Sequence, residues 1–221
     1  MALIQIGLDD DSYVEHNRQY EEDGKFQKEL AGHMEHRKTG YSQLWDRGHR
    51  HGEVLDSTNF ETAVDIGSGT GWFSNYLVEK RNYKKVYAIE PSAAAQNIAQ
   101  KINPNVKEIE WITGFAEEEI GKLKLKKPTF FSTLCVLAHI PCNVVEKILK
   151  SVYSVAPTGS VLCSFEPWGP EFHDPASIWH VRTKDWWQQQ LPEWNFSFEE
   201  RELMTWPAHP ERFMGFVATK G

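Results

Sequence analysis

A glycine-rich segment directly after an apolar stretch carries the sharpest chemical signal in the sequence. It reads Val64-Asp65-Ile66-Gly67-Ser68-Gly69-Thr70-Gly71, with glycines at three alternate positions. Because glycine has no Cβ, such a loop turns at positive φ and lets a ligand rest against the main chain, beside the first N–H groups of the next helix. Glu90 follows about 20 residues later, where a carboxylate can accept hydrogen bonds from both hydroxyls of a ribose. The pattern indicates a site for an adenosine-type cofactor.

The spacing of the glycines selects among such cofactors. A dinucleotide fingerprint has the form G-x-G-x-x-G, but here the third glycine comes one residue early and Trp72 occupies its place. A phosphate-binding loop of the form G-x-x-x-x-G-K is absent, since no Lys or Arg follows until Lys80 and Arg81. The loop therefore disfavours NAD and nucleoside triphosphates.

Strands that alternate with helices must position these groups. Apolar stretches predict strands at 62–66, 85–89, 108–113, 130–134 and 161–165, and helical spacing predicts helices at 72–80, 93–102 and 144–155. Two further strands are expected at 198–203 and 213–219. Such alternation is typical of an α/β fold with a parallel sheet covered on both faces, which binds ligands beyond the carboxyl ends of its strands.

Taken together, these features resemble the class I S-adenosylmethionine-dependent methyltransferases. The segment Leu137-Ala138-His139-Ile140-Pro141 is similar to the L-x-H-x-P pattern after that family's fourth strand, and Ala156-Pro157-Thr158-Gly159 resembles its L-K-P-G-G turn. The resemblance covers residues 60–165, and 198–219 looks like the family's last two strands. It implies a Rossmann-like, doubly wound, seven-stranded and mostly parallel sheet with an antiparallel last strand and an N-terminal helical cover. It also implies S-adenosyl-L-methionine as the cofactor.

The resemblance also implies roles for single residues. Asp65 would face the methionine ammonium group, and Glu90 would bind the ribose. Phe115 stands where the family often has an acid that contacts adenine, so the ring is expected to pack on Phe115 and to meet the Ala116 backbone, with Glu117 as a substitute acceptor. The expected cofactor-binding residues are Asp65, Gly67, Ser68, Gly69, Gly71, Glu90, Pro91, Phe115 and Ala116.

A methyl acceptor is expected at the same edge of the sheet. His139 would lie there, where a neutral imidazole can take a proton from a substrate hydroxyl; a supporting residue or a helix cap is the alternative. The Trp-rich segment after the fifth strand is typical of an insertion that walls an acceptor pocket, although a packed core explains it equally well. Candidate acceptor contacts are Trp168, His173 and His180, joined by Tyr41 and Trp45 ahead of the first strand.

Length and charge bound the class of protein. The 221 residues predict one elaborated domain, with a helical cap at 1–55 and an S-adenosylmethionine-binding domain at 56–221 that carries a substrate-pocket insertion at about 167–197. Lys and Arg total 24 against 31 for Asp and Glu, and this net charge of −7 disfavours nucleic acid as a partner. No apolar run approaches the roughly 18 residues of a membrane span, and the N-terminus is unlike a signal peptide, so a cytoplasmic location is expected.

Metal and redox chemistry are not indicated. The three cysteines form no C-x-x-C pair, and the early histidines lie among Arg and Lys residues that oppose a cation, which favours a solvated polar face; these histidines are His33, His36, His49 and His51. We expect methyl transfer to oxygen, nitrogen or carbon of a small or medium-sized metabolite. A non-catalytic S-adenosylmethionine-binding protein and a protein methyltransferase stay open as alternatives, and the sequence leaves the oligomeric state open.

Overall fold

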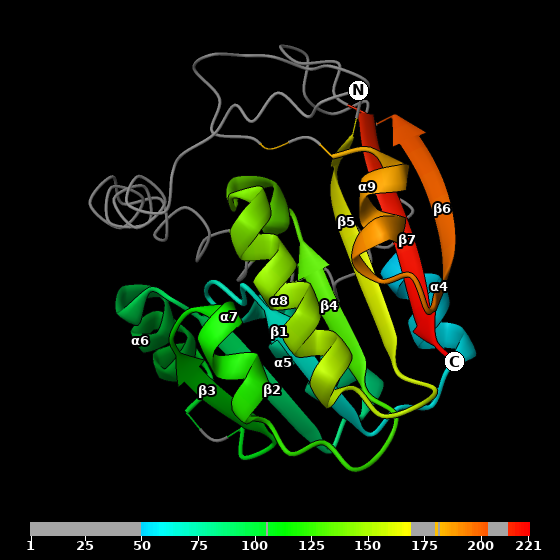
Figure 1. The fold of residues 1–221 in the computed structure, drawn as a ribbon. Coiled ribbons are helices and arrows are strands. Elements are labelled where there is room, and N and C mark those ends of the chain that lie inside the picture. Colours follow the sequence, from blue (N-terminus) through cyan, green and yellow to red (C-terminus); the bar gives the residue numbers. More distant parts are fainter. Residues whose placement is uncertain (1–49, 105, 169–179, 181, 203–211) are drawn as a thin grey trace.

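The computed structural model describes residues 50–104, 106–168, 180, 182–202 and 212–221. These residues form a seven-stranded sheet in the order β3-β2-β1-β4-β5-β7-β6 (Figure 1). Its strands are β1 (Thr62–Ile66), β2 (Lys85–Glu90), β3 (Ile109–Thr113), β4 (Phe130–Leu134), β5 (Val161–Trp168), β6 (Trp194–Glu202) and β7 (Arg212–Lys220). β7 pairs antiparallel with both of its neighbours, and the other pairings are parallel. The expected mostly parallel sheet with an antiparallel last strand is confirmed.

Helices cover both faces of the sheet (Figure 1). One face packs against α4 (Arg50–Ser57), α5 (Trp72–Arg81) and α6 (Ala93–Ile102), and the other against α7 (Ala116–Glu119), α8 (Cys142–Val155) and α9 (Lys184–Gln190). Two short 3-10 helices, η1 (Ile120–Lys122) and η2 (Leu137–His139), complete the order. Because side chains alternate along a strand, Ala63 joins the α4–α5 core while Val64 joins the α8 core. Among the described residues, no helix combines the length and the apolar character needed to cross a membrane.

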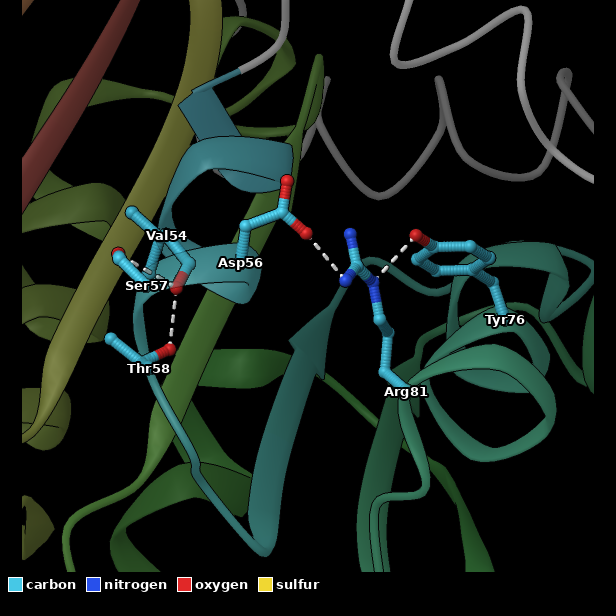
Figure 2. A network of polar contacts seen from close by, with 6 residues as sticks. All are labelled: Val54, Asp56, Ser57, Thr58, Tyr76 and Arg81. Atoms are coloured by element: carbon cyan, nitrogen blue, oxygen red, sulfur yellow. Dashed lines mark hydrogen bonds and ion pairs between the residues drawn. The ribbon is translucent and has the colours of Figure 1, made fainter.

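Helix α4 is fastened to α5 at the end of α5 that is remote from the glycine loop. Arg81, the last residue of α5, donates to the Asp56 carboxylate at 2.6 Å and to the Tyr76 hydroxyl at 2.7 Å (Figure 2). The Asp56 side chain is 69% exposed, so this ion pair contributes at most about 1 kcal/mol to stability. The network lies at the opposite end of α5 from the loop that opens it.

The strand boundaries agree with the sequence analysis to within one residue except at β5, which continues to Trp168 beyond its expected end at residue 165, and at β6. This strand begins at Trp194 rather than Phe198, and Trp194 pairs with Lys220 of β7. Trp194, Phe196 and Phe198 alternate along the strand and contact the same core as α8. This period-two pattern is present in the sequence but is obscured by Pro192 and by the charged residues around it.

One early histidine is buried, which corrects the expectation of a solvated polar face. His51 in α4 has no exposed surface, and its Nε2 lies 3.0 Å from the Ser132 hydroxyl of β4. Its ring meets Phe73 and Phe130 edge-on at 5.6 and 6.0 Å. Because α4 lies against the sheet, its inner face is sequestered even though its sequence is polar. His33, His36 and His49 lie outside the described residues, as do the candidates Tyr41 and Trp45.

Candidate functional site

The segments that carry the predicted site residues emerge side by side at the carboxyl edge of the parallel strands. In the sheet register Ile66 pairs with both Ile89 and Thr133, and Glu90 pairs with Thr113. β1 has β2 on one side and β4 on the other. The chain runs outward from β1 to β2 and β3 and then crosses over to β4, so the strand order reverses at β1. Open α/β sheets bind ligands at such a reversal of strand order.

The loop after β1 adopts the conformation that its glycines predict. Gly67, Gly69 and Gly71 have φ angles of 72°, 51° and 76°, in the left-handed region. The N–H groups of Gly67 and Ser68 both donate to the Ile89 carbonyl, at 2.9 and 3.0 Å, which ties the loop to β2. Gly71 then opens α5 as its N-cap residue.

Packing requires two of these glycines as well. A Cβ on Gly67 would lie 2.5 Å from Val136 Cγ1 in the segment after β4, and a Cβ on Gly71 would lie 2.4 Å from Trp111 Cη2 of β3. Gly71 therefore allows a close approach of helix and sheet, as the third glycine of a dinucleotide fingerprint does one position later. The sequence analysis missed this role because it depends on where Trp111 lies.

The Glu90 carboxylate holds the loop from the neighbouring strand. Its Oε2 accepts from the Gly69 N–H and its Oε1 from the Ser92 N–H, both at 3.0 Å. A carboxylate offers about four lone-pair positions, so Glu90 can bind the loop and still accept hydrogen bonds from a ligand. The Gly114 N–H donates to the Glu90 carbonyl at 3.1 Å, which brings Phe115 to the same edge.

The residues expected near adenine flank Glu90. Phe115 is the N-cap residue of α7 and packs half-buried against the α8 core, and Ala116 is buried beside it. Pro91 lies half-buried between Glu90 and the start of α6. An apolar ring and a small buried residue next to a carboxylate form a fitting surface for a nucleoside.

Two loop hydroxyls also fit a polar ligand. Ser68 and Thr70 are buried, and within the described part of the chain their side-chain oxygens have no hydrogen-bond partner. Buried polar atoms are nearly always paired, so an unpaired set needs an explanation. Together with the positive φ angles and Glu90, these hydroxyls show that the residues present fit an adenosine cofactor with a polar tail.

Asp65 is a buried acid on the strand that leads into the loop. The Ser74 hydroxyl of α5 donates to its Oδ2 at 2.6 Å. Burial raises the pKa of Asp65 from its ordinary value of 3.8 to about 6, although the hydrogen bond from Ser74 acts in the opposite direction. The carboxylate is thus ionised at neutral pH at a cost to the stability of the fold.

Asp65→Asn is expected to stabilise the fold at pH 7.5 by about 1–3 kcal/mol. The ionised carboxylate destabilises the folded state above pH 6, by about 3 kcal/mol for a shift from 3.8 to about 6, and this penalty disappears as the pH falls from 6 to below 3.8. Asn avoids the penalty and can still accept from Ser74. Urea unfolding at pH 7.5 and at pH 4 checks the prediction. A variant that is less stable than the wild type at pH 7.5 would contradict it.

Residues 136–140, the post-β4 turn, carry His139. The turn follows Cys135, whose φ of 55° is left-handed and whose N–H donates to the Phe165 carbonyl at 2.8 Å. His139 is half-exposed on η2, and the N–H of His180 donates to the Ala138 carbonyl at 2.6 Å. Two of the predicted acceptor-side histidines are thus brought to one turn. Trp168 ends β5, but its side chain, like all of His173, lies outside the described part of the structure.

His180 is neutral at this position. It is buried, and burial together with the neighbouring Arg182 charge lowers the pKa of its imidazole to about 4. Its Nε2 has no hydrogen-bond partner among the described residues. A neutral, unpaired imidazole at this edge can accept or donate a hydrogen bond to a ligand.

The sequence analysis missed two charged residues that contact the post-β4 turn. Glu166 and Arg182 are 2% and 1% exposed, and both make hydrogen bonds to the main chain of the turn. The available signals were an acid in an apolar strand and an arginine in a run of tryptophans. Neither signal shows which groups the side chain meets.

Comparison with known proteins agrees with this geometry. A family model described as a methyltransferase domain matches residues 27–208. No curated protein matches the chain. Among solved structures, the YcgJ protein from Bacillus subtilis is 12% identical with a TM-score of 0.59, over 78% of this chain and 99% of that one. A SAM-dependent methyltransferase from Anabaena variabilis is 13% identical with a TM-score of 0.56, over 72% and 77% of the two chains.

A third solved structure contains a ligand. Phosphoethanolamine N-methyltransferase 2 from Haemonchus contortus, in complex with S-adenosyl-L-methionine, is 10% identical with a TM-score of 0.59, over 74% of this chain and 49% of that one. At such identities the likeness to solved structures establishes a shared fold.

Proposed function

The chain belongs to the methyltransferase domain family, and from that premise we propose that it transfers the methyl group of S-adenosylmethionine to oxygen, nitrogen or carbon of a small or medium-sized metabolite. The observation that carries the proposal is that the glycine loop, Glu90 and the post-β4 turn meet at one edge of the sheet. When bound, S-adenosylmethionine supplies a methyl group on a cationic sulfur, which an acceptor atom can attack in line.

The cofactor would be held by groups that the fold already fixes. The loop from Gly67 to Gly71 would receive the methionine and ribose portions, with Glu90 accepting from the ribose hydroxyls. Asp65 would attract the ammonium group, which in turn favours the ionised carboxylate. Phe115 and Ala116 would contact adenine. Each of these roles is supported by the position of the residue at the carboxyl edge.

The acceptor would bind on the side of the post-β4 turn. His139 would take a proton from a hydroxyl or amine acceptor, and the neutral His180 would form a hydrogen bond to it. Methyl transfer needs alignment more than acid–base assistance, so these residues mainly orient the acceptor and exclude water. The net charge of −7 argues against a nucleic acid as the acceptor, and the proposal takes the acceptor to be a cytoplasmic metabolite. The cap at 1–55 and the insertion at about 167–197 stay part of this proposal.

His139→Gln is expected to lower kcat by about 100-fold for a hydroxyl or amine acceptor, the lower end of the usual range for a general base. The affinity for S-adenosylhomocysteine should change by less than about threefold, because the side chain serves the acceptor. The difference in kcat between the variant and the wild type should become smaller at high pH, where the acceptor loses its proton without a general base. Steady-state rates across pH check this, and an unchanged kcat at neutral pH would remove His139 from the reaction.

The function is tested with the full chain, methyl-labelled S-adenosylmethionine and cell extract separated by size into metabolites and proteins. The proposal predicts that label enters the metabolite fraction and that S-adenosylhomocysteine accumulates in step. Label in the protein fraction alone would favour a protein methyltransferase. Cofactor binding without transfer to either fraction would favour a non-catalytic binding protein.

A further inference from the structure

We infer that Glu166 and Arg182 act together as positioning residues that hold the post-β4 turn against the glycine loop and so place His139. The inference rests on the proposed function, since the turn borders a cofactor site only if the loop binds S-adenosylmethionine. Neither residue belongs to the glycine loop, and the two are contributed by separate parts of the chain, the end of β5 and the residues just before α9.

The Glu166 carboxylate binds the start of the turn. Its Oε1 accepts from the N–H groups of Val136 and Leu137 at 3.3 and 3.2 Å, and its Oε2 accepts from the Ala138 N–H at 3.0 Å. The first N–H groups of a helical turn have no partner within the turn itself. A buried carboxylate supplies all three of them with a charge-assisted acceptor.

The Arg182 guanidinium binds two carbonyl groups of the same turn. Its Nη1 donates to the Leu137 carbonyl at 2.7 Å, and its Nη2 donates to the Ile140 carbonyl. The guanidinium lies over the rings of Trp186 and Trp187, 5.0 and 5.6 Å from their centroids, which fixes its plane. The main chain just before Arg182 is also bound to the turn, because the His180 N–H donates to the Ala138 carbonyl.

The two charges therefore act on one peptide segment, Glu166 on its N–H groups and Arg182 on its carbonyl groups. A negative group facing N–H groups and a positive group facing carbonyl groups both match the peptide dipoles of the turn. A buried charge pair is weak evidence for stability, because removing charges from water is costly. What points to positioning is that most of the hydrogen bonds of both groups go to the main chain of this turn. The others join Glu166 to the Thr133 side chain, and Arg182 to the His180 carbonyl and the Cys142 side chain.

The post-β4 turn contacts the cofactor side of the proposed site, at the glycine loop, and carries His139 on the acceptor side. Val136 packs so closely on the loop that a Cβ on Gly67 would meet its side chain at 2.5 Å. His139 lies on η2, between the residues that Glu166 and Arg182 contact. A displaced turn would thus disturb the loop and the histidine together.

The test is calorimetric titration with S-adenosylhomocysteine of the full-length wild type, Arg182→Met, Glu166→Gln and the double variant, well below their melting temperatures. Each single substitution should raise the Kd at least tenfold. The Kd of the double variant should be at most threefold higher than that of the single variant that binds more weakly, because both residues act through one turn.

Arg81→Met is the matched control. It likewise removes a guanidinium that donates hydrogen bonds and lies over an aromatic ring, but the Arg81 partners are the Asp56 and Tyr76 side chains at the other end of α5 (Figure 2). Its Kd should match the wild type within twofold.

A purely structural role would lower the melting temperature of these variants and leave the Kd unchanged, and that result would overturn the inference. Independent, multiplicative losses in the double variant would overturn the joint action of the two residues. If Arg182→Met does not fold, Arg182→Lys replaces it; a single ammonium cannot reproduce the two-carbonyl fork, so a three- to tenfold loss is expected and an unchanged Kd contradicts the inference. A wild type that does not bind S-adenosylhomocysteine would contradict the proposed function itself, which separates the two failures.

Discussion

Glu90→Ala is expected to weaken S-adenosylhomocysteine binding about 100-fold or more, which corresponds to about 2.8 kcal/mol. The substitution would remove the two hydrogen bonds proposed between the ribose hydroxyls and this carboxylate, each of a kind that contributes about 1.5–3 kcal/mol. The N–H groups of Gly69 and Ser92 lose their acceptor as well, so the loop is held less firmly. Isothermal titration of both proteins measures the difference directly.

The control for this experiment is Glu110→Ala. Glu110 is a half-exposed acid on β3 that pairs with Lys85 at 2.6 Å, so the substitution removes the same side chain from the neighbouring strand. Its effect on S-adenosylhomocysteine affinity should be less than about twofold. Glu90→Gln should fall between the wild type and Glu90→Ala, because it keeps one acceptor oxygen. If Glu90→Ala binds as tightly as the wild type, Glu90 is not part of the cofactor site.

The second large effect is expected for Gly71→Ala, which should destabilise the fold by about 2–5 kcal/mol. A left-handed φ of 76° costs a residue with a Cβ about 1–2 kcal/mol, and forcing that Cβ against Trp111 costs about 1–3 kcal/mol more. Because Gly71 joins the loop to α5, S-adenosylhomocysteine affinity should fall in parallel. Urea unfolding measures the stability.

Two further variants test whether crowding against Trp111 causes the loss of stability expected for Gly71→Ala. Gly121→Ala introduces a Cβ whose nearest neighbour is the Ser151 hydroxyl oxygen at 4.0 Å, so its unfolding free energy should stay within about 0.5 kcal/mol of the wild type. The double variant Gly71→Ala/Trp111→Leu should lose less stability than the sum of its single substitutions, because the smaller side chain removes the clash. Strict additivity would contradict the packing explanation.

The parts of this molecule that could be predicted from the sequence are those encoded over short distances. The glycine loop and its two acids can be recognised in the sequence. A tight turn needs glycine, Asp65 comes just before that turn, and Glu90 follows at the end of the next strand. The order of strands and helices follows from periodicity for the same reason. His139 and His180 could be assigned to one edge of the sheet, although their shared turn could not be predicted.

The parts that could not be predicted depend on contacts between distant segments. In the sequence Glu166 is an acid at the end of an apolar strand and Arg182 is an arginine between tryptophans. Their common target is evident only once β5 and the residues before α9 flank the post-β4 turn. His51 looks solvated within a polar sequence but is covered because α4 lies on the sheet. Gly71 was read as a ligand-contacting glycine, and its packing role became evident only from the position of Trp111.

The most direct test of the account is a thermal-shift comparison of the full chain with S-adenosylmethionine, S-adenosylhomocysteine, NAD and ATP. A ligand that binds only the folded state adds about 2.7 kcal/mol of stability at 100 times its Kd, so binding is readily seen. We expect S-adenosylmethionine and S-adenosylhomocysteine to raise the melting temperature, and NAD and ATP to leave it unchanged. A shift with NAD, or no shift with any of the four, would contradict the assignment of the glycine loop and Glu90 to S-adenosylmethionine.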